Sequence, residues 1–181
     1  KLPDVNHLGE VMDVPGVLNS SEELMEKIAI TRKYKKAVDG HAPGLSGEAL
    51  KKYAAAGITT DHECVEIGEA LEKIACGIKI QIREGSAAKD FDKLYPLLGT
   101  HPESCMFSSD DRHPDDLLKG HINLLVKKAV ALGIDPLNAM KAASLNPTLH
   151  YGLDCGLLRQ GDSADFLIVD NLRDFNVLKC F

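Results

Sequence analysis

The feature that most constrains this fold is a regular alternation of short apolar runs with helical patterns. The strand-like runs lie at residues 5–12, 37–41, 58–62, 78–84 and 105–110. The helical patterns lie at residues 22–36, 46–56, 65–76, 91–98, 114–132 and 136–144. Strands that alternate with helices are typical of βαβ units, so we predict an α/β chain with a parallel sheet.

The ends of the strand-like runs favour a closed barrel over an open sheet. An open doubly wound sheet would show the same alternation, but no Gly-rich phosphate loop follows the first run. The runs end at Glu10, His41, His62, Glu84 and Asp110. In a barrel the carboxyl ends of the strands form one mouth, where active sites are built. We therefore predict the later strands and helices of a partial (β/α)8 TIM-type barrel over residues 1–152.

The pattern changes in the last thirty or so residues of the chain. Residues 156–162 resemble a turn-rich hairpin, and residues 164–170 resemble a buried strand. We expect residues 153–181 to form the start of a small β domain of the β-sandwich type. In the preceding barrel segment, we expect the helix at 65–76 to turn Ile67, Leu71, Ile74 and Ala75 inward.

Composition argues against several classes of protein. Lys+Arg 21 against Asp+Glu 27 gives a net charge of −6, which disfavours binding to nucleic acid or to an anionic membrane. No apolar run approaches the roughly 20 residues that span a bilayer, and no signal-peptide pattern opens the chain. The five cysteines contain no C-x-x-C pair. We therefore expect reduced thiols in a cytoplasmic protein, with Cys64 in the packing rather than in a disulfide or a zinc site.

Two histidines at consecutive strand ends suggest a metal site. His41 lies in a loop that Gly40, Pro43 and Gly44 constrain, and His62 stands at the equivalent point one unit later. Imidazole nitrogens at one barrel mouth can share a divalent ion such as zinc, iron or manganese. A surface or core role for each histidine is the alternative.

Three acidic strand ends could complete such a site. Asp110 could bind a metal and move a proton, although Asp115 and Asp116 after it suit the first turn of a helix. Glu10 could bridge two ions or be a solvated loop acid. Glu84 could face a substrate or form a surface pair with the neighbouring Arg83.

These residues, in this order, resemble the amidohydrolase superfamily and, within it, the adenine deaminases. The similar segments are Leu8-Gly9-Glu10-Val11-Met12, Val38-Asp39-Gly40-His41-Ala42-Pro43-Gly44, Asp61-His62-Glu63-Cys64, Ile82-Arg83-Glu84-Gly85-Ser86 and Asp110-Asp111-Arg112-His113-Pro114. Two later segments resemble the superfamily's run into its β-sandwich: Ala143-Ser144-Leu145-Asn146-Pro147 and Gly161-Asp162-Ser163-Ala164-Asp165.

The resemblance implies a metal-dependent hydrolase that converts adenine to hypoxanthine and ammonia. It implies a divalent metal centre, binuclear, with Mn or Fe and alternatively Zn. Glu10 would bridge the two ions, His41 and His62 would bind one, and Asp110 would bind the other and shuttle the proton. Glu84 would lie near the purine, with Asp111, His113 and Ser86 in the supporting loops. We also expect a homo-oligomer with no nucleic-acid or membrane partner.

One departure from the superfamily pattern stands out. Amidohydrolases bind their first metal partly through an H-x-H pair on the first barrel strand, and this chain contains no H-x-H. There is no initiator Met, so we expect a part of a longer protein that is inactive by itself and exposes a sheet edge. The alternatives are an amidohydrolase for another nucleobase or a cyclic amide, and a non-catalytic barrel relative.

Overall fold

The computed structural model describes residues 5–181, and the chain divides into two compact units. The first unit ends at Gln81, and the second comprises Ile82–Phe181. Residues 1–4 of the predicted barrel segment lie outside the described residues. The predicted domain boundary at residue 152 stays a prediction.

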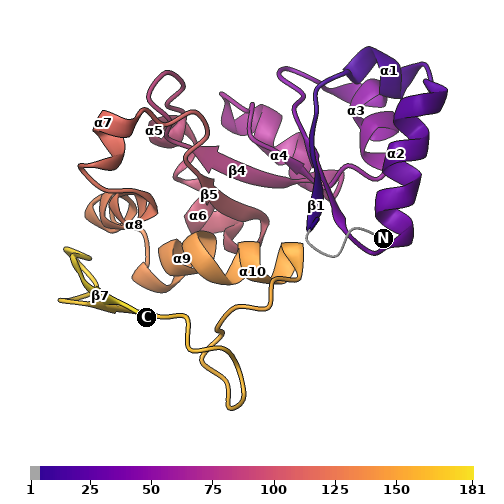
Figure 1. Cartoon of the computed structure of the whole chain (residues 1–181). Coiled ribbons are helices and arrows are strands. Elements are labelled where there is room, and N and C mark those ends of the chain that lie inside the picture. The colour runs from indigo at the N-terminus through magenta and orange to yellow at the C-terminus, as the bar shows by residue number, and fades with distance from the viewer. Residues whose placement is uncertain (1–4) are drawn as a thin grey trace. The chain divides into compact units, whose positions relative to one another are not determined.

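The first unit alternates strands and helices as the sequence predicts (Figure 1). Its elements are β1 (His7–Val11), α1 (Val14–Leu18), α2 (Glu22–Lys33), β2 (Ala37–Gly40), α3 (Gly47–Ala55), β3 (Thr60–Asp61), α4 (Ile67–Ala75) and the first residues of β4 (Lys79–Arg83). The sequence analysis missed α1, because Pro15 and Gly16 lower its helix propensity. Asp13 caps this helix by accepting a hydrogen bond from the Gly16 N–H at 2.9 Å.

The strands of the first unit run parallel. β1 pairs with β2 in the register His7↔Ala37, Leu8↔Val38, Val11↔Gly40. The Thr59 N–H donates to the Val38 carbonyl at 2.9 Å, which ties the chain entering β3 to β2. β3 pairs with β4 through Thr60↔Lys79 and Asp61↔Ile80. The carboxyl ends of β1, β2 and β3 therefore face the same way, as a shared site requires.

A hydrophobic core lies between these strands and the helices α1, α2 and α3, which gather beside β1 in Figure 1. The strand side is built by β-branched residues, against which pack one buried residue each from α1 and α2 and two, Leu50 and Tyr53, from α3. The fully buried members include Val11, Val38, Ile58, Val17, Ile28 and Leu50. This burial fixes each strand by one face and leaves the residues after its carboxyl end free to build a site.

The second unit continues with more helices than the sequence analysis predicts. After the end of β4 come α5 (Phe91–Leu94), α6 (Leu97–Thr100), η1 (Pro102–Ser104), β5 (Cys105–Ser108), α7 (Pro114–Leu117), α8 (Ile122–Ala131), α9 (Pro136–Met140), η2 (Lys141–Leu145) and α10 (Asn146–Tyr151). The Glu84 N–H donates to the Ser108 carbonyl at 3.0 Å, so the chain leaving β4 runs beside β5. The buried residues of this unit include Phe91 of α5, Leu98 of α6, Met106 of β5 and Leu125 of α8.

Three helix predictions need correction. The pattern at 91–98 is two short helices, because Pro96 interrupts it. The long helix expected over 114–132 is α7 and α8, separated by Gly120 at φ +136°, a conformation that a continuing helix excludes. The helix expected over 136–144 continues instead through a π-helical turn into α10, where Gly152 ends it in the left-handed conformation.

The β element at the carboxyl end differs from its prediction in two respects. The hairpin lies later in the chain, as β6 (Leu167–Val169) paired antiparallel with β7 (Val177–Cys180), and residues 156–162 form turns without strands. The strand expected to be buried is exposed among the described residues, with Leu167 at 50% and Ile168 at 42% exposure. The α/β class and the parallel pairing are confirmed, and closure into a barrel stays a prediction.

Candidate metal centre

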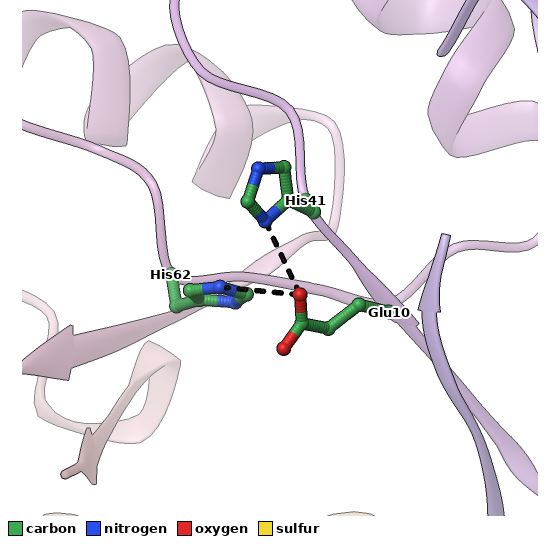
Figure 2. A group of neighbouring side chains, drawn as sticks. All are labelled: Glu10, His41 and His62. Carbon is green, nitrogen blue, oxygen red and sulfur yellow. Dashed lines mark ion pairs between the residues drawn. The ribbon is translucent and has the colours of Figure 1, made fainter. Parts of the chain in front are cut away.

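Glu10, His41 and His62 meet at the carboxyl ends of three consecutive strands. Glu10 lies on β1, His41 follows β2 and His62 follows β3. The Glu10 Oε2 atom lies 3.3 Å from His41 Nδ1 and 3.8 Å from His62 Nε2, so both rings face the same carboxylate oxygen (Figure 2). The two rings stand edge to face with centroids 5.2 Å apart. One potential ligand atom from each of the three lies within 4.8 Å of the others.

Glu63 is a second carboxylate at this centre that the sequence analysis quoted but gave no role. Its Oε1 atom lies 3.5 Å from His41 Nδ1 and 3.4 Å from His62 Nε2. Two imidazoles therefore face two acids in a partly buried position. The signal that could have found Glu63 is its place directly after His62 at the strand end.

The donor set fits a divalent cation. His41 Nδ1 is buried and makes no hydrogen bond among the described residues, although it faces carboxylate oxygens. A buried polar atom without a hydrogen bond is costly, and a cation bound there would satisfy it. Two imidazole nitrogens with carboxylate oxygens are ligands that Zn, Fe and Mn-type ions accept. No Cys Sγ belongs to this group.

Tyr53 of α3 holds the backbone at the entrance to the His41 loop. Its hydroxyl accepts from the His41 N–H at 3.1 Å and donates to the Val11 carbonyl at 2.7 Å. Burial raises the pKa of this phenol to about 12. Tyr53 therefore stays neutral and links the residue after β2 to the last residue of β1.

Asp61 and Lys73 form a buried ion pair behind the two histidines. Asp61 precedes His62, and its Oδ2 lies 2.9 Å from the Lys73 Nζ, with both side chains at 0% exposure. Burial alone would raise the pKa of Asp61, but the charge and hydrogen bond of Lys73 hold it below its usual value. Burial alone would lower the pKa of Lys73, but Asp61 and the neighbouring acidic groups hold it above its usual value. Both groups are therefore charged near neutral pH.

A second set of potential ligand atoms belongs to Asp61, Cys64 and Glu69. The Lys73 ammonium contacts both carboxylates of this set, so it already supplies the positive charge there. Cys64 is fully buried and free, and burial raises the pKa of its thiol well above the usual range. The prediction that Cys64 lies in the packing is confirmed, and this set is not a second candidate metal site.

In the second unit, Glu84 is held from two sides. Its Oε1 lies 3.0 Å from the Lys128 Nζ, and its backbone carbonyl accepts from Arg112 Nη1 at 3.1 Å. Its Oε2 atom is buried and has no hydrogen-bond partner among the described residues, and the same holds for Arg112 Nε. An unfilled acceptor thus follows the end of β4, and an unfilled donor lies in the loop after β5.

Asp110 is bound by Arg83 in this unit. The Asp110 Oδ2 accepts from Arg83 Nη1 at 3.2 Å, and Arg83 Nε donates to Asp90 at 2.8 Å. Asp110 adopts φ +48°, a left-handed conformation that aspartate tolerates better than most residues. The alternative of a surface pair between Arg83 and Glu84 is wrong, because Arg83 is buried and pairs with two aspartates.

Ser86 joins the loop after β4 to the loop after β5. Its hydroxyl donates to Asp116 Oδ2 at 2.6 Å and accepts from the His113 N–H at 2.8 Å, while its own N–H donates to the Asp111 carbonyl at 3.0 Å. Lys119 and Ser86 together lower the pKa of Asp116 to about 2. His113 caps α7 by accepting from the Asp115 N–H, with Asp115 and Asp116 in the first turn. These bonds give Ser86, Asp111 and His113 a place in one loop network.

Parallel strands whose carboxyl ends carry two histidines and acids define an α/β protein with a candidate divalent-metal centre. The chain belongs to the amidohydrolase family, whose model matches residues 4–181. Among the described residues, no helix is long and apolar enough to cross a membrane.

Curated adenine deaminases are among the proteins to which this chain is similar. The chain is 53% identical over 178 residues to the adenine deaminase from Salinibacter ruber, and this alignment covers 98% of this chain and 33% of that protein. It is 51% identical over 179 residues to the adenine deaminase from Sulfurovum sp., and this alignment covers 99% of this chain and 34% of that protein. The chain therefore spans about a third of the length of these relatives.

Two solved structures share the fold. A β-aspartyl dipeptidase from Fervidobacterium islandicum matches with a TM-score of 0.73 and 17% identity, over 99% of this chain and 56% of that chain. An N-acetyl-D-glucosamine-6-phosphate deacetylase from Mycobacterium smegmatis matches with a TM-score of 0.67 and 15% identity, over 88% of this chain and 50% of that chain.

Proposed function

We propose that this chain is the later part of the barrel of an adenine deaminase, which hydrolyses adenine to hypoxanthine and ammonia. The observation that carries the proposal is the meeting of Glu10, His41 and His62 at three strand ends. This meeting occurs in a chain that is about half identical to adenine deaminases over nearly all its length. The length of those relatives and the missing H-x-H pair support the view that further ligands come from a longer protein.

The centre would hold divalent metal through the chain's own side chains. His41 and His62 would bind one ion, Glu10 would bridge to a second, and Asp110 would bind that second ion. We propose Mn or Fe as the metal, with Zn as the alternative. Bound ions of this kind supply a nucleophilic water near neutral pH.

Side chains of this chain would then transfer the proton from the attacking water to the leaving group. Adding water to C6 of adenine and losing ammonia forms a C–O bond and breaks a C–N bond. Asp110 would accept the proton of the attacking water and deliver it to the departing amine. Arg83 would hold the Asp110 carboxylate in one orientation through the 3.2 Å hydrogen bond. The buried, unfilled Oε2 of Glu84 supports a role for that acid as an acceptor for a purine N–H.

Purine turnover by the full-length protein that contains this chain tests the proposal. With added Mn²⁺ or Fe²⁺ we expect hypoxanthine and ammonia in equal amounts from adenine. Asp110→Asn is expected to lower kcat/KM about 10²–10⁴-fold, the usual contribution of a positioned acid–base group. Asp115→Asn, the same change at an exposed position in the first turn of α7, should leave kcat/KM nearly unchanged.

The outcomes separate the alternatives. Full activity of Asp110→Asn would contradict the assigned proton path. Turnover of another nucleobase or of a cyclic amide in a substrate panel, without turnover of adenine, would move the protein to another specificity in the same family. Less than one equivalent of metal in the full-length protein would favour a non-catalytic relative.

A further inference from the structure

Lys73 is a fully buried charge of the first unit that the proposed chemistry does not use. It lies on α4, and its side chain has 0% exposure. Its ammonium contacts the Ala42 carbonyl at 2.6 Å, Asp61 Oδ2 at 2.9 Å and Glu69 Oε1 at 2.7 Å. An ammonium group has three donors, and each has an acceptor here.

The contacts of Lys73 reach the loop that carries His41. Lys73 holds the carbonyl of Ala42, the residue after His41, and Asp61 Oδ1 accepts from the Ala42 N–H at 2.7 Å. Both backbone polar groups of Ala42 are therefore fixed by the same buried ion pair. Glu69, which also contacts Lys73, accepts a hydrogen bond from the Gly44 N–H at 2.8 Å and so holds the same loop at a further point.

The same ion pair holds the loop that carries His62. Asp61 immediately precedes His62, and its Oδ2 accepts from the N–H of Glu63 at 3.0 Å. The Cys64 thiol also lies 3.3 Å from this oxygen. The backbone on both sides of His62 is thereby tied to the group that fixes the residue after His41.

We propose that Lys73 is a positioning residue of the metal centre, which sets the separation and direction of the His41 and His62 rings by joining their two loops through Asp61. Lys73 touches neither ring and acts only through the backbone that carries them. The inference rests on the proposed function insofar as the two histidines bind a divalent ion. It adds a determinant of metal affinity on a helix that contributes no ligand.

Metal affinity of the full-length protein tests this inference without reference to turnover. Lys73→Met removes the ammonium and keeps most of the side-chain volume. In folded protein, verified by circular dichroism, we expect Mn²⁺ to bind 10–100-fold more weakly by chelator competition, as is usual when groups that orient metal ligands are lost. Lys51→Met, the same change at an exposed position of α3, should leave the Mn²⁺ affinity unchanged.

A double variant separates positioning from stability. Lys73→Met leaves buried Asp61 without its partner, whereas Asp61→Asn with Lys73→Met removes both charges and should recover folding. We expect the double variant to fold and still bind Mn²⁺ at least 10-fold more weakly than wild type. A structural role alone predicts that folding and affinity return together. Should neither variant fold, Glu69→Ala, which removes one ammonium contact near the surface, is expected to weaken binding about threefold.

Metal titration of the wild-type protein separates a failure of the proposed metal centre from a failure of the role of Lys73. Absence of Mn²⁺, Fe²⁺ and Zn²⁺ binding by wild type would overturn the proposed metal centre and this inference with it. Wild-type binding together with unchanged affinity in folded Lys73→Met or in the double variant would overturn the role of Lys73 alone. If Glu69→Ala is the only variant that folds, Mn²⁺ affinity equal to that of wild type in this variant would also overturn the role of Lys73.

Discussion

Tyr53 shows how one buried hydroxyl can determine the geometry of a strand end. Its side chain is fully buried, and its hydroxyl accepts from the His41 N–H and donates to the Val11 carbonyl. Removing the oxygen would leave the Val11 carbonyl and the His41 N–H without this partner. A buried backbone group without a hydrogen bond costs more than the net value of the bond itself.

Tyr53→Phe is therefore expected to lower the free energy of unfolding by about 1–3 kcal/mol in urea denaturation. Tyr34→Phe is the matched control, because Tyr34 is 43% exposed at the end of α2 and should change stability by less than about 0.5 kcal/mol. Equal stability of the two variants would contradict the role assigned to the Tyr53 hydroxyl.

Asp116, in the first turn of α7, gives a prediction about charge at the start of this helix. The hydrogen bonds from Lys119 and Ser86 favour its ionised form, so its pKa lies at about 2 against an ordinary value of 3.8. Because the folded-state pKa is lowered, the bond from Ser86 contributes to stability above pH 3.8 and is lost as the pH falls towards 2. NMR titration of the Asp116 carboxyl carbon should show this midpoint directly.

Substitution of Lys119 and of Ser86 tests whether these two residues lower the pKa of Asp116. Lys119→Met and Ser86→Ala should each raise the pKa of Asp116 towards its ordinary value. Lys141→Met removes a lysine that pairs with Glu103 in the same unit, and it should leave the Asp116 titration unchanged. A midpoint near 3.8 in the wild type would contradict the hydrogen-bond pattern around Ser86.

At the scale of elements, β2 and β3 approach so closely at Gly40 that a side chain does not fit. A Cβ atom there would lie 2.3 Å from the Thr60 carbonyl oxygen and 2.7 Å from Ile58 Cγ2. Gly40→Ala would therefore push the strands apart next to His41, at a cost of about 1–3 kcal/mol of unfolding free energy. It should also weaken metal binding in the full-length protein.

Gly9→Ala on the neighbouring strand β1 is the control for this change. A Cβ at Gly9 has no atom within 4 Å, so stability and metal binding should stay close to wild type. Urea denaturation and Mn²⁺ titration of both variants test the contrast. Tolerance of alanine at Gly40 would show that β2 and β3 can separate without cost to the site.

The ends of strands could be predicted from the sequence more readily than the breaks within helices. Four polar strand ends could be predicted, because apolar runs end near His41, His62, Glu84 and Asp110, whereas Glu10 lies within β1, one residue before its end. The breaks within helical patterns were harder to predict, since Gly120 and Pro96 sit inside runs whose periodicity continues across them. At these positions the apolar periodicity favours a continuous helix, whereas the backbone preferences of Gly and Pro favour a break. The break is what the structure shows.

The inward face of α4 could not be predicted from periodicity. Ile67, Leu71, Ile74 and Ala75 were expected inside, but Leu71 is 38% exposed and Ala75 is exposed as well. The buried residues of the helix are Ala70 and Lys73. A lysine is rarely fully buried unless it is paired, so nothing local signals this position. The partner that makes burial possible, Asp61, comes from another element and becomes apparent only in three dimensions.

At the scale of the whole molecule, the proposed ligands are distributed over both units. Glu10, His41 and His62 lie in the first unit, and Asp110 and Glu84 lie in the second. The roles of these five residues stay predictions, whereas the meeting of the first three is a structural fact. An active site built from several strand ends depends on every strand that contributes a ligand.

This dependence leads to a prediction about the isolated chain. Eight strands close a barrel of this type, and the described residues contain five strands, β1 to β5, before the β6–β7 hairpin. The chain also lacks the H-x-H pair with which amidohydrolases bind the first metal. The 181-residue chain by itself should therefore show no release of ammonia from adenine.

The comparison is made at equal molar concentration, with the same Mn²⁺ supply, between the isolated chain and the full-length protein that contains it. Ammonia release by the full-length protein alone is the expected result. Mixing the isolated chain with the remainder of the protein tests whether the missing strands and ligands are the cause, since reassembly should restore turnover. Robust adenine turnover by the isolated chain would mean that its own strand ends suffice, and the proposed dependence on ligands from elsewhere would be wrong.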